Sequence, residues 1–478
     1  MVFSSLFFLY VFLPLNLILY FALPWMKAKN AVLLLFSLFF YAWGEPFFVF
    51  VMLGTAFLDY AHARFIESHR GTAAAKLSMI IAVTTDIAIL ASFKYLSFFI
   101  DNLNLIPFVN IHNPNIALPI GISFYTFQTL TYVIDVYRGK VSVQKSYFRY
   151  LLYLTSYFQL VAGPIVRYEY VEGAIDERKT TIEGFSYGVY RFTTGLAKKV
   201  ILANSLGELS ARYMDGNLET LPVLGAWVGM ISFTLQLYFD FSGYSDMAIG
   251  LGSIFGFSFP ENFNYPYVSK TVSEFWRRWH ITLGSFFRDY VYIPLGGNRK
   301  RVYFNLFVVW ALTGLWHGAS WNFILWGLYN GLFIALERLI LPKKDKLDSL
   351  LSSKGVAAVF HTYLVLCVNF GFVLFYFTDM ARLGEFSKVL FGFGQRALIS
   401  PELTIDLTNN CILLAVAILL CTPIFGKIKS FAALLEKDSA TAVYLISVVK
   451  LAFVAAVLII CTVLLVGNSF NPFLYFRF

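Results

Sequence analysis

Long apolar stretches recur along this whole chain, and polar residues are confined to short segments between them. The candidate stretches are residues 3–24, 31–43, 46–60, 78–100, 118–136, 150–166, 182–208, 223–248, 303–316, 320–340, 356–378, 408–426 and 441–466. In lipid, every backbone polar group needs a partner within the protein, which leaves only helices and closed barrels. Runs of this length favour helices, although several are shorter than the roughly 20 residues of a full crossing. The sequence therefore predicts an all-α polytopic membrane protein with about 11–13 transmembrane or re-entrant helices.

Composition supports this class and excludes others. Only 14% of the 478 residues are charged and 58% are hydrophobic, whereas soluble domains carry about 25% charged residues. A soluble enzyme, a disordered chain and a nucleic-acid-binding domain are excluded. The net charge of +9 is attributed to cytoplasmic loops. No linker or repeat divides the chain, so residues 1–478 are predicted to form one integral-membrane domain.

The distribution of Lys and Arg predicts the topology. Basic residues at 27–29, 64–76, 138–149, 256–302, 343–354 and 427–437 mark cytoplasmic loops, whereas 101–117 contain none. The N-terminal segment has no basic n-region and is expected to be a retained first span. Both termini are therefore predicted to be extracytoplasmic. The four cysteines lie in apolar stretches without metal-ligand spacing, so neither a metal nor a disulfide is expected.

Two histidines are candidates for chemistry. His317 lies in the motif GLWHGASWNFILWG (314–327), within an apolar run, where ionisable residues are costly and usually functional. His280 lies in residues 271–290, which are predicted to form one amphipathic helix at the cytoplasmic interface. Phe275, Trp279, Leu283 and Phe287 would make its apolar stripe, and Arg277, His280, Gly284 and Arg288 its polar face. Alternatively, His317 is a core histidine, and the second segment is a surface helix without chemistry.

Acidic residues within apolar stretches allow another function. Asp240 and Asp246 could serve a polysaccharide exporter or an ion-coupled transporter, or could pair with basic residues. A scaffold for a glycan synthase is a third alternative. We also include Asp240 among the candidate substrate-binding residues. Gly252 and Gly256 are interpreted as a GxxxG helix-packing pair.

Several long motifs resemble those of membrane-bound O-acyltransferases. They are FQLVAGPIVRY (158–168), YFDFSGYSDMAIGLGSIFGFSFPENFNYP (238–266), EFWRRWHITLGSFFRDYVYIPLGGN (274–298) and the motif around His317. The match is dense from about 118 to 340 and is closest to the bacterial polysaccharide O-acetylation branch. The resemblance implies helices around a central funnel or tunnel in a bacterial cytoplasmic membrane, with His317 as the catalytic base and His280 as a second catalytic histidine.

The resemblance also suggests how acetyl groups travel. Acetyl-CoA is the expected co-substrate, with no tightly bound cofactor. Arg277, Arg278 and Arg288 would hold its phosphates, and Trp316, Trp321 and Asn322 would supply N–H groups to an oxyanion. The C-terminal FLYFRF (473–478) resembles a motif of the related D-alanylation machinery, which implies that Tyr475 relays the acetyl group. The expected partners are an extracytoplasmic SGNH-type O-acetyltransferase, a polysaccharide acceptor and the lipid bilayer.

Overall fold

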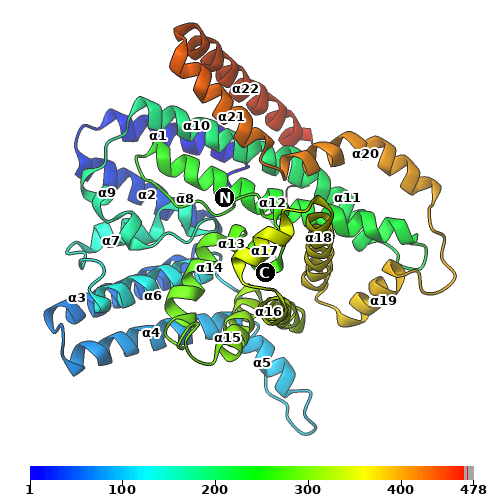
Figure 1. The fold of residues 1–478 in the computed structure, drawn as a ribbon. Coiled ribbons are helices and arrows are strands. Elements are labelled where there is room, and N and C mark those ends of the chain that lie inside the picture. Colours follow the sequence, from blue (N-terminus) through cyan, green and yellow to red (C-terminus); the bar gives the residue numbers. More distant parts are fainter. Residues whose placement is uncertain (468–470, 472–478) are drawn as a thin grey trace. The chain divides into compact units, whose positions relative to one another are not determined.

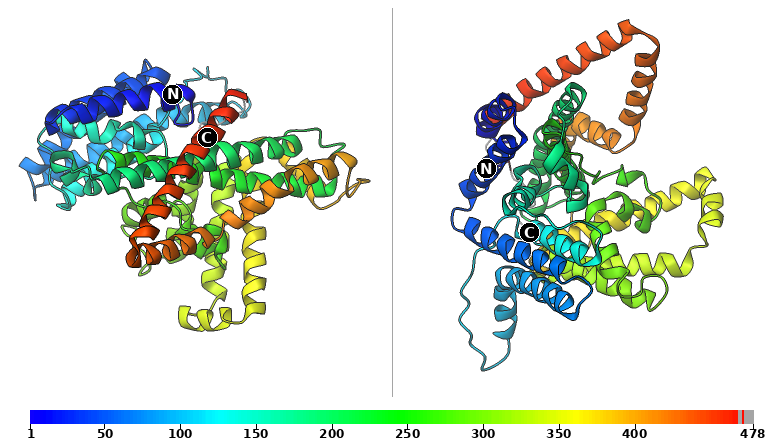
Figure 2. Two further views of the ribbon diagram at one scale, coloured as in Figure 1. Left: turned by 90° about the horizontal axis from the view of Figure 1, so that it is seen from above. Right: turned by 90° about the vertical axis from the view of Figure 1, so that its left-hand side faces the viewer.

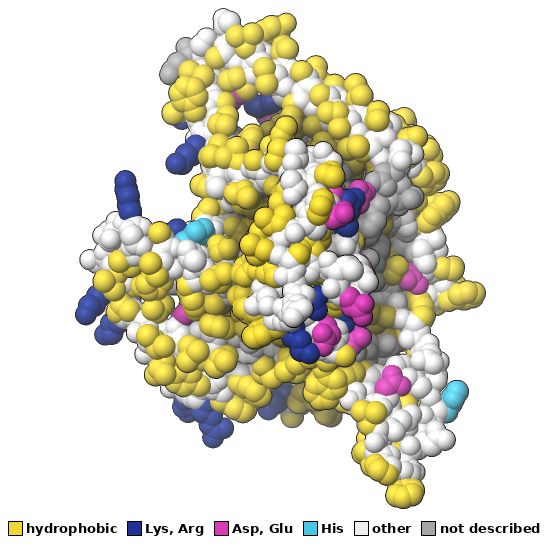
Figure 3. Space-filling model, turned by 90° about the vertical axis from the view of Figure 1, so that its right-hand side faces the viewer, with side chains coloured by type: hydrophobic (Ala, Val, Ile, Leu, Met, Phe, Trp, Pro, Cys, Tyr) yellow, Lys and Arg dark blue, Asp and Glu magenta, His cyan; other side chains and the backbone are white. Residues whose placement is uncertain are grey.

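The computed structural model describes residues 1–467 and 471, and they are helical with no strand among them (Figure 1). Among the described residues, seven helices are long and apolar enough to cross a membrane: α3 (Phe48–Ser68), α4 (Ala73–Lys94), α12 (Val223–Ile254), α16 (Trp321–Ile340), α18 (Lys354–Tyr376), α20 (Pro401–Leu420) and α22 (Ala440–Gly467). Shorter apolar helices cover Phe8–Ala22 and Val302–His317. The all-α polytopic prediction is therefore confirmed. Hydrophobic side chains dominate the face shown in Figure 3, and Lys and Arg gather in small groups, as expected of a surface that meets lipid.

The described residues form two compact units. Unit 1 comprises Met1–Phe192 and Tyr244–Pro260, and unit 2 comprises Thr193–Gly243 and Glu261–Phe478. Helices α10 (Ile182–Ala197) and α12 (Val223–Ile254) contribute residues to both. Whether the chain acts as one domain stays a prediction.

Unit 1 contains the N-terminal helices. They are the π-helix η1 (Phe8–Phe12), α1 (Leu13–Ala22), α2 (Met26–Gly44), α3 (Phe48–Ser68), α4 (Ala73–Lys94), α5 (Leu96–Leu103), α6 (Ile122–Arg138), α7 (Tyr147–Thr155), α8 (Tyr157–Leu160), the 3₁₀ turn η2 (Tyr168–Tyr170) and α9 (Glu172–Glu177). Helices α3, α4 and α6 pack on one another. A buried Thr129 hydroxyl on α6 donates to Asp86 on α4 at 2.8 Å. Asp86 thus has a structural hydrogen bond between helices.

Unit 2 contains the other helices. They are the π-helix η3 (Lys198–Ala203), α11 (Asn204–Met214), the 3₁₀ turn η4 (Pro266–Val268), α13 (Val272–Arg278), α14 (Ile281–Phe287), the π-helix η5 (Arg288–Tyr292), α15 (Val302–His317), α16 (Trp321–Ile340), α17 (Lys344–Leu351), α18 (Lys354–Tyr376), α19 (Met380–Leu390), α20 (Pro401–Leu420), α21 (Ile424–Asp438) and α22 (Ala440–Gly467). Helices α16 and α18 run alongside each other, and the short α17 joins them at one end (Figure 2).

The predicted span 150–166 is wrong as one helix. Helix α7 ends at Thr155, the chain turns at Ser156, and after Leu160 it is largely irregular. Tertiary contacts satisfy the backbone at this break. The Tyr157 N–H donates to Ser37 Oγ at 3.2 Å, and the Tyr153 hydroxyl donates to the Val166 carbonyl at 3.0 Å. An apolar run could not reveal this, because the Ser37 acceptor lies on α2, far away in sequence, and the Tyr153–Val166 bond forms only once the chain has turned.

The predicted helix at 408–426 starts too late. Helix α20 begins at Pro401, where the Ser400 hydroxyl accepts the Leu403 N–H, and it ends at Leu420. Ser before Pro is a helix-start signal that hydropathy alone overlooks.

The interpretation of Gly252 and Gly256 as a GxxxG helix-packing pair is also wrong. Gly256 ends α12 with φ +85°, whereas Gly250 makes the close helix contact, because a Cβ there would lie 2.6 Å from the Phe192 nitrogen on α10.

Candidate active site

Helices α15 and α16 form a tightly packed hairpin that places His317. A Cβ on Gly314 would lie 2.3 Å from the Phe323 carbonyl oxygen, and one on Gly327 would lie 2.3 Å from the Trp310 carbonyl oxygen. The two helices therefore pack backbone against backbone at these glycines. His317 is the last residue of α15, so the hairpin sets its position.

Aromatic rings surround the His317 imidazole. The ring of Trp326 lies 4.9 Å away and that of Phe375 lies 5.1 Å away, both nearly perpendicular to the imidazole. Trp326 belongs to α16 and Phe375 to α18, so three helices restrict the orientation of this histidine. Its side chain is half-buried and lines a cavity.

His280 lies at a sharp corner, so the predicted single helix over 271–290 is wrong. Helix α13 ends at Arg278, and His280 has φ +46° and ψ +54° before α14 starts at Ile281. A left-handed conformation is uncommon for a residue other than glycine. Asn262 stabilises the corner, because its Oδ1 accepts from His280 Nδ1 at 3.1 Å and from the Thr282 hydroxyl at 2.9 Å.

The corner buries His280 instead of presenting it on a polar surface. Its side chain is 3% exposed, and the Phe241 ring packs 4.7 Å from the imidazole. His280 lies outside the candidate membrane-spanning helices, and burial lowers its pKa to about 3. The imidazole is therefore neutral at pH 7. The Asn262 oxygen accepts a hydrogen bond from the Nδ1–H group, so in the neutral ring Nε2 carries the lone pair. Among the described residues, no side chain or backbone group hydrogen-bonds to Nε2.

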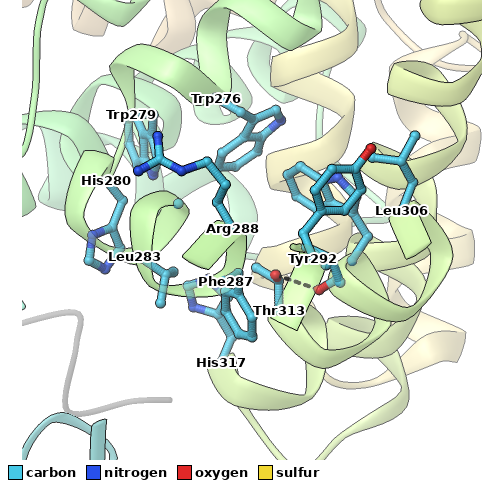
Figure 4. Close-up of a pocket in the computed structure, with 13 residues that line it drawn as sticks. Trp276, Trp279, His280, Leu283, Phe287, Arg288, Tyr292, Leu306, Thr313 and His317 are labelled. Carbon is cyan, nitrogen blue, oxygen red and sulfur yellow. Dashed lines mark hydrogen bonds between the residues drawn. The ribbon is translucent and has the colours of Figure 1, made fainter. Parts of the chain in front are cut away.

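One cavity of about 200 Å³ brings His280 and His317 together (Figure 4). Its other walls are Trp276, Trp279, Leu283, Gly284, Phe287, Arg288, Tyr292, Leu306, Val309, Trp310 and Thr313. Figure 4 shows the two histidines on one side, and Tyr292 and Leu306 on the other. Apolar, largely aromatic walls and few polar groups are typical of a small-molecule site.

Of the three arginines proposed for phosphate binding, the structure brings only Arg288 to the cavity. Its guanidinium is largely exposed and forms an ion pair with Asp289 at 2.7 Å. Arg278 instead binds Glu274 at 2.9 Å, within one helix. Arg277 is exposed and does not line the cavity.

The three predicted N–H donors lie in different environments. Trp316 is buried, and its ring lies 5.8 Å from that of His280 and 4.9 Å from that of His317. Trp321 is 53% exposed and lies outside the cavity lining. Asn322 is fully buried, but its side-chain nitrogen donates to the Phe375 carbonyl at 3.0 Å, which joins α16 to α18. Of the three, only Trp316 therefore lies beside both histidines, and it too is outside the cavity lining.

Asp240 does not reach the cavity. It pairs with Lys199 at 2.8 Å, and both side chains are almost completely buried. Asp246 pairs with Arg191 at 2.6 Å. Opposite charges at these distances fit the structural alternative for both acids. In residues 1–467 and 471, no group of three or more His, Cys, Asp or Glu could hold a metal ion.

Tyr475 lies outside the described residues. Asn471, four positions before it in sequence, is described, and its Oδ1 accepts from Asn204 Nδ2 at 3.2 Å.

Sequence reasoning missed residues that shape the site. Asn262 builds the His280 corner, and Trp276, Trp310, Tyr292 and Thr313 line the cavity. The aromatic density of the motifs was a usable signal for the tryptophans. Asn262 had none, because its role depends on a contact 18 residues away in sequence.

The fold and cavity define a multi-pass membrane protein with a buried, histidine-containing site suited to proton transfer. Residues 46–377 match the sequence profile of the membrane-bound O-acyltransferase (MBOAT) family. The chain belongs to this family and is an O-acyltransferase.

Named relatives share this similarity over long stretches. The probable alginate O-acetylase AlgI of Azotobacter vinelandii is 37% identical, with 100% of both chains covered. The peptidoglycan O-acetyltransferase of Helicobacter pylori is 35% identical over 71% of this chain and 70% of its own. The teichoic acid D-alanyltransferase of Bacillus subtilis is 30% identical over 56% of this chain and 70% of its own.

Proposed function

We propose that this protein takes an acetyl group from cytosolic acetyl-CoA for O-acetylation of an extracytoplasmic polysaccharide, with His317 as the base. The observation that carries the proposal is the convergence of His317 and His280 on one aromatic cavity. The relatives named for alginate and peptidoglycan O-acetylation support the substrate class.

The cavity suits a short acyl group. A cavity of about 150 Å³ holds benzene, and this one encloses about 200 Å³. Trp276 and Trp310 are bulky parts of its wall. An acetyl thioester end therefore fits better than a long fatty chain.

The proposed chemistry is an acyl transfer between sulfur and oxygen. His317 takes the proton of the attacking hydroxyl as the new C–O bond forms. The C–S bond of the thioester then breaks, and the proton passes from His317 to the leaving thiolate. The Trp316 indole N–H is the proposed donor to the transient oxyanion. Neutral His280 is the second proposed catalytic histidine: its Nε2 lone pair is proposed to accept a hydrogen bond from a substrate group in the cavity, while His317 alone carries the transferred proton.

Acetyl-CoA must be held at the cavity, and its acetyl group must be passed to the outside of the membrane. Arg288 at the cavity edge is the proposed contact for a phosphate of acetyl-CoA. Tyr475 is the proposed acetyl relay toward an extracytoplasmic SGNH-type transferase. This requires the C-terminus to face outward in a bacterial cytoplasmic membrane, as the loop charges predict.

The first test compares wild type with His317→Ala in cells at matched membrane levels, measuring base-labile acetate on envelope and secreted polysaccharide. We expect acetate to be lost while polymer secretion continues. His112→Ala is the matched control, because His112 is an exposed loop residue. Unchanged acetate in His317→Ala would refute the catalytic assignment, and lost secretion with normal acetate per sugar would support transport.

The relay is tested separately. Tyr475→Phe should abolish polymer acetylation, whereas Tyr444→Phe, at a 70% exposed site, should not change it. Wild-type acetylation in Tyr475→Phe would eliminate the relay but leave the His317 assignment standing.

A further inference from the structure

Glu337 on α16 is a buried acid that accepts hydrogen bonds from the backbone at the start of another helix. Asp240, Asp246 and Asp406 each pair with a basic side chain. Glu337 is 6% exposed, and within the described part of the chain it makes no ion pair. Its carboxylate instead accepts the backbone N–H groups of Val272 at 2.5 Å and Ser273 at 2.8 Å.

These bonds fix the start of α13. The Tyr363 hydroxyl on α18 also donates to Glu337 at 3.3 Å. A buried carboxylate is costly unless donors compensate it, and charge-assisted bonds are about twice as strong as neutral ones. Separation of α13 from α16 would therefore leave a carboxylate and two N–H groups without these partners. The next N–H, of Glu274, is bound by Thr271 Oγ1 at 3.1 Å, so the first turn of α13 is firmly held.

The other end of α13 leads directly to His280. The helix covers Val272–Arg278, and His280 follows two residues later at the corner. Asn330, which lies seven residues before Glu337 on α16, accepts from Trp276 Nε1 at 3.0 Å. Residues seven apart lie on nearly the same side of a helix. One side of α16 thus binds α13 at two levels, and one of the bound residues, Trp276, lines the cavity.

Helix α16 also sets the position of His317. Gly327 of α16 packs against the Trp310 backbone of α15, and Gly314 of α15 packs against the Phe323 backbone of α16. Trp310 and Gly314 lie two turns or less before His317 at the end of α15. A single helix therefore connects both histidine-bearing segments.

We propose that Glu337 is a positioning residue for acyl transfer: by binding the start of α13 to α16, it sets the place of His280 relative to His317. The inference rests on the proposed function of the two histidines. Glu337 lies outside the cavity lining and acts through α13, not on the substrate.

The test uses Glu337→Gln in the full-length protein in lipid nanodiscs. Gln has nearly the same size, but it carries no charge and has only one acceptor oxygen. We expect turnover of acetyl-CoA to fall by between about tenfold and about a hundredfold, as a misplacement of roughly 1 Å can cause. The KM for acetyl-CoA should change by less than about threefold, because Arg288 and the cavity walls contributed by α15 do not belong to the loosened helix α13.

Two further variants separate positioning from general stability. Asp406→Asn removes another buried carboxylate, at a site bound to Arg212 and Tyr213, and should lower the melting temperature without lowering turnover per folded molecule. In a His280→Asn background, Glu337→Gln should cost less than about twofold. An equal loss in both backgrounds would refute action through His280.

Hydrogen exchange provides a readout that does not need activity. The backbone of residues 271–280 should exchange faster in Glu337→Gln than in wild type, and unchanged exchange would overturn the proposal. Failure of the proposed function itself would be seen separately, as full activity of His317→Ala.

Discussion

Gly327→Ala is the substitution whose consequence follows most directly from the structure. The new Cβ would lie 2.3 Å from the Trp310 carbonyl oxygen and 3.0 Å from the Gly314 nitrogen and Cα. All three are backbone atoms of α15, so no side chain can rotate away. Since ordinary contact begins at 3.4 Å, the hairpin must open by about 1 Å.

That displacement reaches the site. In an open helix position, Gly→Ala stabilises by about 1 kcal/mol, whereas overpacking of this kind costs about 1–3 kcal/mol. His317 follows Trp310 on the same helix and should move with it. We therefore expect a lower melting temperature and a loss of turnover of up to about a hundredfold per folded molecule.

The assay is acetyl-CoA turnover by protein in nanodiscs, normalised to the monodisperse fraction on size exclusion and compared with thermal unfolding. Gly355→Ala is the control, because a methyl group added at Gly355 would have nothing within 4 Å of it. Wild-type turnover and melting temperature in Gly327→Ala would show that the hairpin is not closely packed at Trp310, and the account of how His317 is placed would be refuted.

Three further predictions follow from buried polar groups. Burial lowers the pKa of His280 from 6.5 to about 3, so between these pH values the unfolded chain binds a proton that the folded chain does not. The free energy of unfolding should therefore fall as the pH drops below about 6.5, by up to about 1.4 kcal/mol per pH unit. His280→Asn should flatten this pH dependence. Lys199→Met leaves Asp240 buried without its ammonium 2.8 Å away and should cost about 3–5 kcal/mol in chemical unfolding, whereas adding Asp240→Leu should restore much of it. Asn322→Ala removes the bond to the Phe375 carbonyl and should cost about 1–3 kcal/mol by thermal unfolding; an unchanged midpoint would contradict a structural role for this amide.

The sequence motifs identified both histidines, but they did not predict the surroundings of His280. His317 was identifiable because it lies in an apolar run rich in Gly and Trp, where an ionisable side chain is expensive. His280 was identified by resemblance, but its environment was predicted incorrectly as a polar helix face. Helical periodicity assumes regular dihedral angles, and a residue at φ +46° interrupts them.

The sequence also could not show which of Arg277, Arg278 and Arg288 reaches the cavity. Their sequence positions near His280 made all three equal candidates for phosphate binding. The break at the corner directs only Arg288 to the cavity, while Arg278 reaches Glu274 within its own helix.

The amino-acid sequence by itself determined that this chain lies in a lipid bilayer and therefore that it is an all-α membrane protein. Apolar runs of span length require helices in lipid, and capping residues such as Thr271 mark helix starts without reference to the rest of the fold. Only the tertiary structure decided where helices break and which polar groups meet. Asn262 bends the chain at His280, and Glu337 binds Val272 across 65 residues of sequence. Such contacts exist only after packing has brought distant segments together, so no local pattern encodes them.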